Sequence, residues 1–265
     1  MLINSYFANS KGMGLGDFIR GSIASQQLCS EHNLKFQVDF SHHQIGKYLI
    51  SRCDEPAPSI DSIVNLRDIP NFSIRALEKN LRSITRINSL KRNNLHIYTN
   101  VWPNFKITRR VSRQILNFLE PNDDLQMSLD DVTPKTEYSV IHIRAGDMLS
   151  FKSQIGDVVD HTLDDLLNML HPHMLDFKHK NYVVLSDCAQ LKKVLSKKYN
   201  LIDIQTKPSH STLKKSNVLD TLIDYFVMSK AKEIHQFSVH YWGSGFSESI
   251  NWLYGVPIKK HKLVL

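Results

Sequence analysis

The sequence lacks the features that mark membrane-spanning and exported proteins. Its 265 residues contain no apolar run of about 18 or more, so no transmembrane helix is expected. Residues 1–6 have neither the basic region nor the apolar stretch of a secretory signal peptide, and they are typical of a β-strand. Hydrophobic residues make up 42% and charged residues 22%, which predicts an ordinary globular core in a chain long enough for two domains.

Cysteine is scarce and metal-binding patterns are missing. Cys29, Cys53 and Cys188 are far apart and form neither a Cys-x-x-Cys pair nor a Cys/His cluster with zinc spacing. The acidic pairs at residues 123–124, 130–131 and 164–165 are read as solvated or capping residues rather than metal ligands. No nucleophile elbow, P-loop or H-E-x-x-H motif occurs. These absences predict a cytoplasmic protein with reduced core cysteines, no metal and no resident cofactor.

Acidic residues are outnumbered by basic ones. The chain has 33 Lys and Arg against 26 Asp and Glu, a net charge of +7. This balance favours an anionic partner such as a nucleotide sugar, an anionic lipid headgroup or a nucleic acid. The positive charge is scattered and lacks an aromatic-plus-basic surface motif, which argues against nucleic acid. A basic nucleic-acid-binding protein therefore remains only as an alternative hypothesis.

Strand and helix patterns alternate along both halves of the chain. Residues 2–7 and 36–40 read as strands flanking a glycine turn and a helix, which is a βαβ unit. The second half repeats the alternation, beginning with a strand at 139–144 and ending with a helix at 246–254. An acidic, turn-rich stretch at 121–134 separates the halves. The sequence thus predicts two facing Rossmann-like α/β domains, residues 1–135 and 136–265.

The most informative segment is residues 138–147, Y-S-V-I-H-I-R-A-G-D, a buried strand that ends in a tight turn. His142 and Arg144 lie near its carboxyl end, and strand alternation places both side chains on one face. Open α/β sheets bind ligands outside the carboxyl ends of their strands. Because arginine makes bidentate hydrogen bonds to phosphate, the pair indicates a phosphorylated ligand. The alternative is a structural ion pair of Arg144 with a carboxylate.

Two later strand ends carry polar groups. Ser186 and Asp187 end an apolar strand, where the carboxylate can accept hydrogen bonds from a guanine edge or a ribose. The alternative is that either residue caps the next helix. A second group of polar residues lies at the start of the last helix, at Ser244, Gly245, Phe246 and Ser247. Its backbone N–H groups and hydroxyls can bind an anion, or they can serve as an ordinary helix cap.

The N-terminal glycines follow the first strand but do not form a dinucleotide fingerprint. The pattern Gly12-x-Gly14-x-Gly16 is followed by Asp17, where G-x-G-x-x-G would need glycine. Asp17 would also repel a pyrophosphate, and it is a candidate helix cap. Arg20, one turn into the helix, is expected to point at the same cleft as this turn. The segment is either a turn that a ligand approaches closely or a purely structural turn.

The segment His142-Ile143-Arg144-Ala145-Gly146-Asp147 resembles the H-x-R-R-G-D motif of the α1,2/α1,6/protein O-fucosyltransferase superfamily. Residues 183–187, 220–229, 234, 244–247 and 252 are similar to the family's later segments in the same order. The likeness is best over residues 140–257. It implies a divergent member with a two-domain GT-B architecture, a GDP-fucose site in the C-terminal domain, no metal and inversion of the anomeric carbon.

The resemblance also implies roles for individual residues. Arg144 would hold the β-phosphate, with His142 and Asp187 at the nucleoside and Ser186 beside them. The diphosphate would be lined by the loop before the last helix, at Ser244, Gly245, Phe246 and Ser247. The acceptor would be faced by Gly14, Gly16, Asp17 and Arg20. Asp17 and Asp147 are the candidate bases, and Arg144 would compensate the charge of the leaving GDP.

One position departs from the motif, because its second arginine is Ala145. The resulting hypothesis is a cytoplasmic, inverting, metal-independent glycosyltransferase of glycan or polysaccharide assembly, with GDP-fucose or a related GDP-sugar as donor. Basic helices at residues 75–92 and 109–113 suggest peripheral membrane association near a lipid-linked or other glycan acceptor. The alternative that Ala145 keeps open is a catalytically silent nucleotide- or glycan-binding protein of the same fold.

Overall fold

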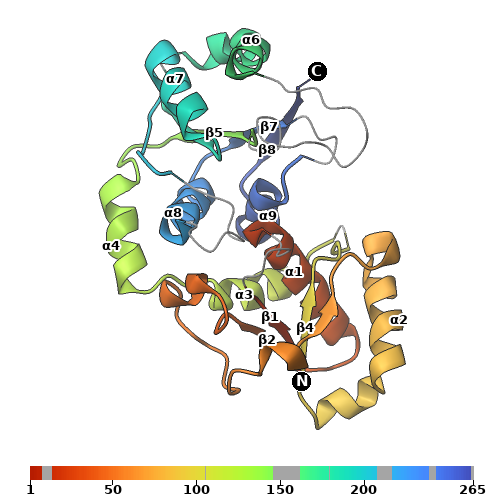
Figure 1. Cartoon of the computed structure of the whole chain (residues 1–265). Coiled ribbons are helices and arrows are strands. Elements are labelled where there is room, and N and C mark those ends of the chain that lie inside the picture. Colours follow the sequence, from red (N-terminus) through yellow and green to blue (C-terminus); the bar gives the residue numbers. More distant parts are fainter. Residues whose placement is uncertain are drawn as a thin grey trace. The chain divides into compact units, whose positions relative to one another are not determined.

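The computed structural model describes residues 1–7, 14–104, 106–145, 162–178, 180–207, 217–238 and 243–263 (Figure 1). The chain divides into two compact units, the first built mainly from Met1–Met127 and the second mainly from the residues after it. Each unit contains one sheet of four strands. The predicted α/β class with two Rossmann-like parts is therefore confirmed, and each unit is described separately below.

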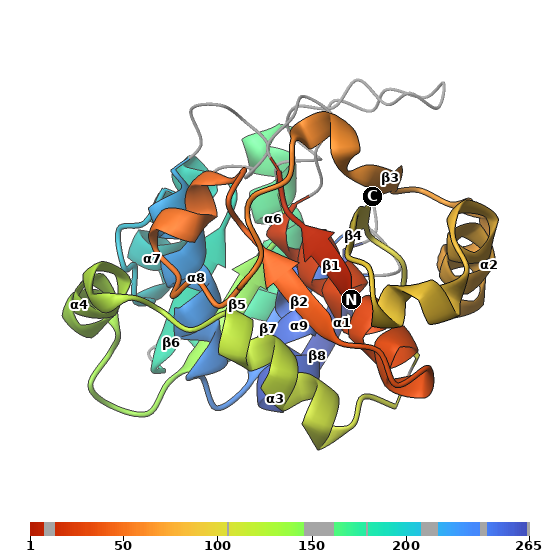
Figure 2. The same cartoon turned by 90° about the horizontal axis from the view of Figure 1, so that it is seen from below.

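The first unit has a parallel sheet with the strand order β2-β1-β4-β3 (Figure 2). Leu2 and Ile97 on one face of this sheet join a core with the helices, whereas Ile3 and His96 occupy the opposite face. α3 packs beside α1. The strands are β1 (Leu2–Ser5), β2 (Phe36–Asp39), β3 (Val64–Leu66) and β4 (Leu95–Thr99), and the helices are α1 (Leu15–Glu31), α2 (Ile74–Ile84) and α3 (Arg109–Phe118).

α1 begins one turn earlier than the sequence indicated. Its N-cap is Gly14, and no side chain caps the helix, so the prediction that Asp17 caps it is wrong. Asp17 instead lies in the first helical turn, where its negative charge interacts favourably with the helix dipole. Gly21 lies against β4, because a β-carbon there would overlap the carbonyl oxygen of Thr99. This close approach explains why residue 21 is glycine, although glycine is unfavourable inside a helix.

Short 3-10 helices connect these elements. Each spans three to five residues, as expected for this geometry. β3 was not predicted, because three residues between prolines carry too little periodicity to be recognised. The 3-10 helices are η1 (Gln44–Lys47), η2 (Ile60–Ser62), η3 (Pro70–Phe72) and η4 (Ile87–Lys91).

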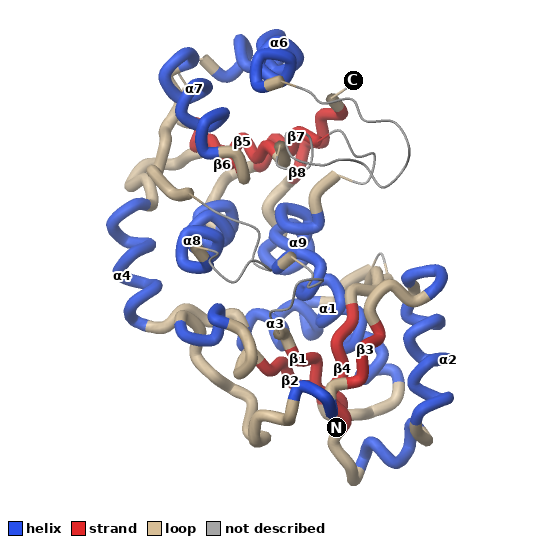
Figure 3. The backbone as a smooth tube through the Cα atoms, viewed as in Figure 1, coloured by secondary structure: helices blue, strands red, loops and turns tan. Residues whose placement is uncertain are grey.

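The second unit has a parallel sheet with the order β6-β5-β7-β8. Helices α6 and α7 lie on one side of this sheet, and α8 and α9 lie on the other (Figure 3). The side chains of alternate strand residues are divided between the two faces, and Ile141 and Phe237 join the core under α6 and α7. The elements are β5 (Ser139–Ile143), α6 (Leu163–Met174), η5 (Leu175–Phe177), β6 (Tyr182–Ser186), α7 (Ala189–Tyr199), α8 (Val218–Ser229), β7 (Ile234–Ser238), α9 (Gly245–Tyr254) and β8 (Ile258–Lys262).

The acidic stretch predicted to be an irregular linker forms helix α4 (Asp123–Val132). Asn122 accepts a hydrogen bond from the backbone N–H of Leu125 at 3.1 Å, which caps the helix. Leu125 and Leu129 are buried at helical spacing, and this outweighed the turn-forming residues. The assignment of residues 1–135 to an acceptor and 136–265 to a sugar nucleotide stays a prediction.

Candidate functional site

The second sheet has a topological switch point between β5 and β7. From β5 the chain continues to β6 on one side, and it then returns to β7 and β8 on the other side. In such sheets a crevice forms where the strand order reverses, outside the carboxyl ends of the two strands. His142 on β5 and Gln236 on β7 are register partners there, so their side chains share one face of the sheet.

His142 is buried on this face and points to α9. Its Nδ1 atom lies 3.0 Å from the hydroxyl oxygen of Ser247, and its ring lies 5.8 Å from that of Phe246. Burial, and then the nearby positive charge of Arg144, lowers the pKa of His142 to about 4. At neutral pH the imidazole is therefore uncharged, which leaves it one donor and one acceptor nitrogen.

Gln236 joins the contact between His142 and Ser247, and no sequence motif predicted this role. Its Nε2 donates to the Ser247 hydroxyl at 2.6 Å and to the carbonyl oxygen of Ser244 at 3.2 Å. Its Oε1 is buried and has no hydrogen-bond partner among the described residues. The burial of Gln236 in strand β7, where a polar side chain normally makes specific hydrogen bonds, is known only from the structure.

One arrangement of the Ser247 hydrogen bonds makes Nδ1 of His142 the acceptor. Because the Ser247 hydroxyl accepts from Gln236, its own proton is available to Nδ1 of His142 at 3.0 Å. The competing acceptor, the Ser244 carbonyl, lies at 3.5 Å. In this arrangement the ring proton of His142 lies on Nε2, which can then donate to a ligand.

The start of α9 supplies backbone donors beside this network. Ser244 is the N-cap, it is buried, and its side chain makes no capping bond, so the simple capping alternative does not hold for it. Gly243, just before it, has φ of +77° and leaves no room for a β-carbon beside Gln236. Glu248 lies in the first turn and is paired with Lys260 at 2.6 Å, which offsets a charge that would repel an anion.

Arg144 follows β5 and is half-buried. Its backbone N–H donates to the carbonyl oxygen of Phe237 at 3.1 Å, which continues the β5–β7 pairing. Its side chain is on the same side of the chain as His142, whose pKa responds to its charge. Ala145 is fully buried in the core under α6 and α7. A second arginine at position 145 would therefore have to bury its charge in that apolar core.

Ser186 and Asp187 secure the neighbouring turn. Asp187 accepts a hydrogen bond from the backbone N–H of Ala145 at 2.7 Å, and Ser186 accepts one from that of Cys188 at 3.1 Å. The N-cap of α7 is Cys188, so neither predicted residue caps this helix. Both residues thus lie at the carboxyl ends of β5 and β6, where they were expected to meet a ligand. Their binding role stays a prediction.

The described residues among those predicted to face the acceptor lie in the first unit, and Arg20 makes its contacts there. The Nε of Arg20 donates to the carbonyl oxygen of Asn100 at 2.8 Å, and its Nη2 pairs with Asp17 at 3.1 Å. The guanidinium also lies 4.2 Å from the centre of the Trp102 ring. Gly14 and Gly16 lie at the start of α1 beside this pair. Asp147 lies outside the described residues.

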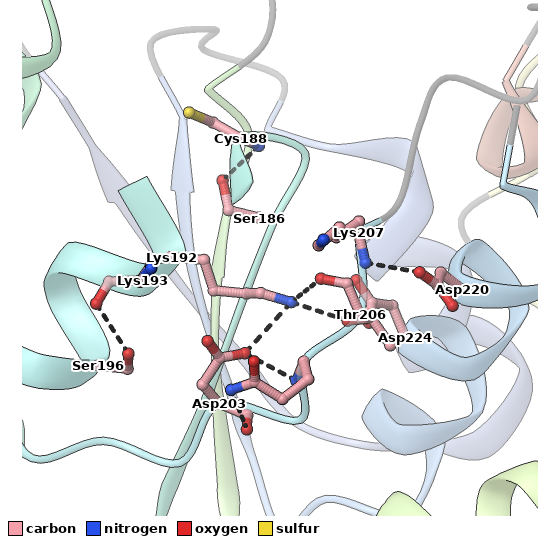
Figure 4. A network of polar contacts seen from close by, with 11 residues as sticks. Ser186, Cys188, Lys192, Lys193, Ser196, Asp203, Thr206, Lys207, Asp220 and Asp224 are labelled. Carbon is pink, nitrogen blue, oxygen red and sulfur yellow. Dashed lines mark hydrogen bonds and ion pairs between the residues drawn. The ribbon is translucent and has the colours of Figure 1, made fainter. Parts of the chain in front are cut away.

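A buried polar network lies between α7 and α8 in the second unit (Figure 4). Lys192 donates to the Thr206 hydroxyl at 2.9 Å and to its carbonyl oxygen, and lies 3.4 Å from Asp203. The Thr206 hydroxyl in turn donates to Asp224 at 2.6 Å. Burial raises the pKa of Asp224 to about 7, although the Thr206 hydrogen bond and the Lys192 charge act against this shift. The network holds residues 203–207 against α8.

Comparisons with known proteins give the architecture a precedent. No protein-family model and no curated protein matches the chain. Fucosyltransferase NodZ from Bradyrhizobium matches with 11% identity and a TM-score of 0.52, over 97% of this chain and 94% of that chain. A mutant of Arabidopsis thaliana FUT1 in complex with GDP matches with 12% identity and a TM-score of 0.55, over 97% and 69%. The chain has a GT-B-like fold.

A third solved structure agrees with this fold. NodZ α-1,6-fucosyltransferase soaked with GDP-fucose has 12% identity and a TM-score of 0.52, and the match covers 99% of this chain and 94% of that one. None of the helices in the described part of the chain combines the length and the apolar character that a membrane span requires. The same described residues contain no group of three or more His, Cys, Asp or Glu placed to hold a metal ion. The absence of a resident cofactor stays a prediction.

Proposed function

We propose that this protein is an inverting, metal-independent glycosyltransferase that uses a GDP-sugar. The observation that carries the proposal is the hydrogen-bonded cluster of His142, Gln236 and Ser247 at the switch point of the second sheet, beside the start of α9. Such a crevice suits a nucleotide, and a helix N-terminus suits its diphosphate. The GT-B-like fold and the sequence motif around His142 and Arg144 support GDP-fucose or a related sugar as the donor.

In the proposed reaction the oxygen of an acceptor hydroxyl bonds to the anomeric carbon from the face opposite the leaving group. The bond from that carbon to the β-phosphate oxygen breaks, and GDP leaves with the electron pair. Arg144 and the N–H groups at the start of α9 stabilise the charge that develops on the diphosphate. The hydroxyl proton passes to a base, for which Asp17 in the first turn of α1 and Asp147 in the motif are the candidates.

The acceptor that we propose is a glycan or lipid-linked saccharide in polysaccharide assembly, and the location is cytoplasmic with peripheral membrane association. The exposed cationic residues of α2, of η4 and of the two caps of η4 support the membrane part, because clustered basic residues attract anionic lipid: they are Arg75, Lys79, Arg82, Arg86, Lys91 and Arg92. The protein should co-sediment with vesicles rich in phosphatidylserine and not with neutral ones. Failure to do so would remove the membrane proposal.

Calorimetric titration with GDP, UDP and CMP tests the donor site. We expect selective GDP binding that Arg144→Ala weakens at least about tenfold, since a charge-assisted pair to phosphate is lost. Arg110→Ala, an exposed arginine on α3 in the other unit, is the matched control and should bind GDP as the wild type does. Preference for UDP or CMP would change the donor. Absence of nucleotide binding would refute the donor site.

Sugar transfer is tested by supplying the donor together with an acceptor and analysing the products. Incubation with GDP-fucose and a glycan acceptor should yield free GDP and a fucosylated product of inverted configuration, which product NMR would identify. GDP binding without transfer or donor hydrolysis, across an acceptor screen, would favour a catalytically silent binding protein instead.

A further inference from the structure

The first unit contains a second candidate site, a pocket of about 480 Å³ beside the end of β2. Its walls are β2 and the segment of residues 40–55, with Phe118 of α3 closing one side. A volume of this size lies in the range typical of small-molecule sites. Every lining residue belongs to the first unit, so the pocket is complete without the His142 cluster.

Asp39 is the residue that marks this pocket as a binding site. It is the last residue of β2, and only 4% of its surface is exposed. Its Oδ1 accepts a hydrogen bond from the backbone N–H of Ser41 at 2.8 Å. Its Oδ2 is buried and has no hydrogen-bond partner among the described residues. Asp39 lines the pocket and carries a buried carboxylate oxygen without a donor, a costly arrangement that a ligand hydroxyl reaching this oxygen would relieve.

Further polar groups surround Asp39 on the sheet face that is opposite the helices. Ser5 on β1 is its register partner, and the Ser5 hydroxyl lies 2.9 Å from Nδ1 of His96 on β4. Burial lowers the pKa of His96, while the negative charges of Asp39 and Glu55 act in the opposite direction. The charges of Asp39 and Glu55 thus reach His96.

The segment that forms the outer wall is fixed in place before any ligand arrives. Oε1 of Gln37 accepts hydrogen bonds from the Cys53 thiol and the backbone N–H of Asp54, both at 3.3 Å. The ring of His43 stacks on that of Tyr6 with centroids 4.0 Å apart. Gly46 packs so closely on Phe40 that a β-carbon would lie 2.8 Å from its carbonyl oxygen. These contacts preorganise the pocket, which lowers the cost of binding.

The lining groups favour a ligand with several hydroxyl groups. Asp39 and Glu55 offer carboxylate acceptors, Lys47 offers a donor, and Arg52, one nitrogen of which pairs with Glu120, has further N–H groups in the same pocket. The two carboxylates disfavour an anion, and the two cationic side chains disfavour a bare cation. A neutral saccharide can donate to Asp39 and accept from Lys47 through its own hydroxyls, with Phe118 supplying an apolar wall.

We infer that this pocket binds a saccharide and that Asp39 accepts a hydrogen bond from one of its hydroxyl groups. The identification of that saccharide as part of the acceptor rests on the proposed glycosyltransferase function. Saccharide binding itself rests on the pocket and on the unpartnered oxygen of Asp39, so the two statements can fail separately.

Cys53 provides a reporter, because it lines the pocket and is partly exposed. Burial raises the pKa of its thiol, so alkylation by iodoacetamide is best followed at mildly alkaline pH by mass spectrometry. Cys188, which is also partly exposed but lies in the second unit, is the internal control. The probes are the methyl glycosides of glucose, galactose, mannose and N-acetylglucosamine at tens of millimolar, with inorganic phosphate for comparison.

At least one glycoside should slow the alkylation of Cys53 several-fold and leave Cys188 unchanged. Asp39→Asn should abolish this protection, since the amide no longer presents the same acceptor, whereas Asp61→Asn, an exposed carboxylate outside the pocket, should retain it. Lys47→Ala removes an exposed donor without touching the core, and it should weaken protection even if Asp39→Asn fails to fold.

Protection by phosphate alone, protection by no glycoside, or protection unchanged in both pocket variants would overturn the inference. A parallel GDP titration separates it from the proposed function. GDP binding without glycoside protection would reject the saccharide pocket and leave the donor site standing. Glycoside protection without GDP binding would support the saccharide pocket and remove its role as an acceptor site.

Discussion

Gln236 and Gly243 fit together so closely that a β-carbon on residue 243 would overlap the carboxamide oxygen of Gln236. Gly243 also has φ of +77°, a conformation that is strained for other residues. Gln236 in turn holds Ser247, which contacts His142. A backbone position in the loop before α9 is therefore linked through two side chains to the carboxyl end of β5.

Gly243→Ala should lower the free energy of unfolding by roughly 2–4 kcal/mol, from backbone strain together with displacement of the Gln236 carboxamide. It should also weaken GDP binding. Gly255→Ala is a matched control, because Gly255 has φ of +75° but nothing within 4 Å of its β-carbon position. The control should lose only about 1–2 kcal/mol and keep GDP binding. Equal effects of the two substitutions in urea unfolding and calorimetry would contradict the role given to Gln236.

The buried His142 should make stability depend on pH. Its folded pKa of about 4 lies below the ordinary value of 6.5, so between these values the unfolded chain binds more protons. Its contribution to stability is present above about pH 6.5 and is lost as the pH falls toward 4, by at most about 3 kcal/mol. His142→Asn should remove this part of the slope in urea unfolding measured at several pH values. An unchanged slope would show that the imidazole is not held neutral.

Asp224 should act in the opposite direction. Its pKa is raised from 3.8 to about 7, so between these values the folded chain binds more protons than the unfolded one. The favourable contribution of its protonated form is present below about pH 4 and is lost as the pH rises through 7, by at most about 4 kcal/mol.

The same pH series applied to Asp224→Asn tests this statement. The amide keeps an acceptor for the Thr206 hydroxyl but cannot ionise, so the decline in stability with rising pH should flatten. Asp164→Asn, an exposed residue in the first turn of α6, should leave the slope as in the wild type. If both variants behave alike, the Lys192 charge compensates Asp224 fully.

Gly21→Ala should destabilise the first unit although alanine is the better helix former. The added β-carbon would overlap the Thr99 carbonyl oxygen, and because this neighbour is backbone, α1 or β4 must shift. We expect a loss of roughly 2–4 kcal/mol in urea unfolding. Glu31→Ala, at an exposed position at the end of the same helix, should be nearly neutral. A Gly21→Ala protein as stable as the wild type would mean that α1 and β4 adjust freely.

The sequence alone determined the alternation of strands and helices, because apolar periodicity reflects which faces must leave water. It determined the buried strand β5 and the placement of His142 and Arg144 on one face, since the period of a strand is two. It also led to the GT-B-like fold, through the motif at residues 142–147. Local rules failed where tertiary burial competed with them, as in α4, where Leu125 and Leu129 outweighed the acidic, turn-forming composition.

Only the tertiary structure decided which distant residues meet. Gln236 joined His142 because β7 pairs with β5 across the switch point, a pairing between residues 94 apart in sequence (236 − 142). Asp39 became notable only when the sheet and the segment after it buried one oxygen of its carboxylate without a partner. Arg20 was expected to face the acceptor, and its side chain contacts Asn100, Asp17 and Trp102. Local sequence limits the conformations of each segment, whereas hydrogen bonding and burial between segments select the partners of each polar group.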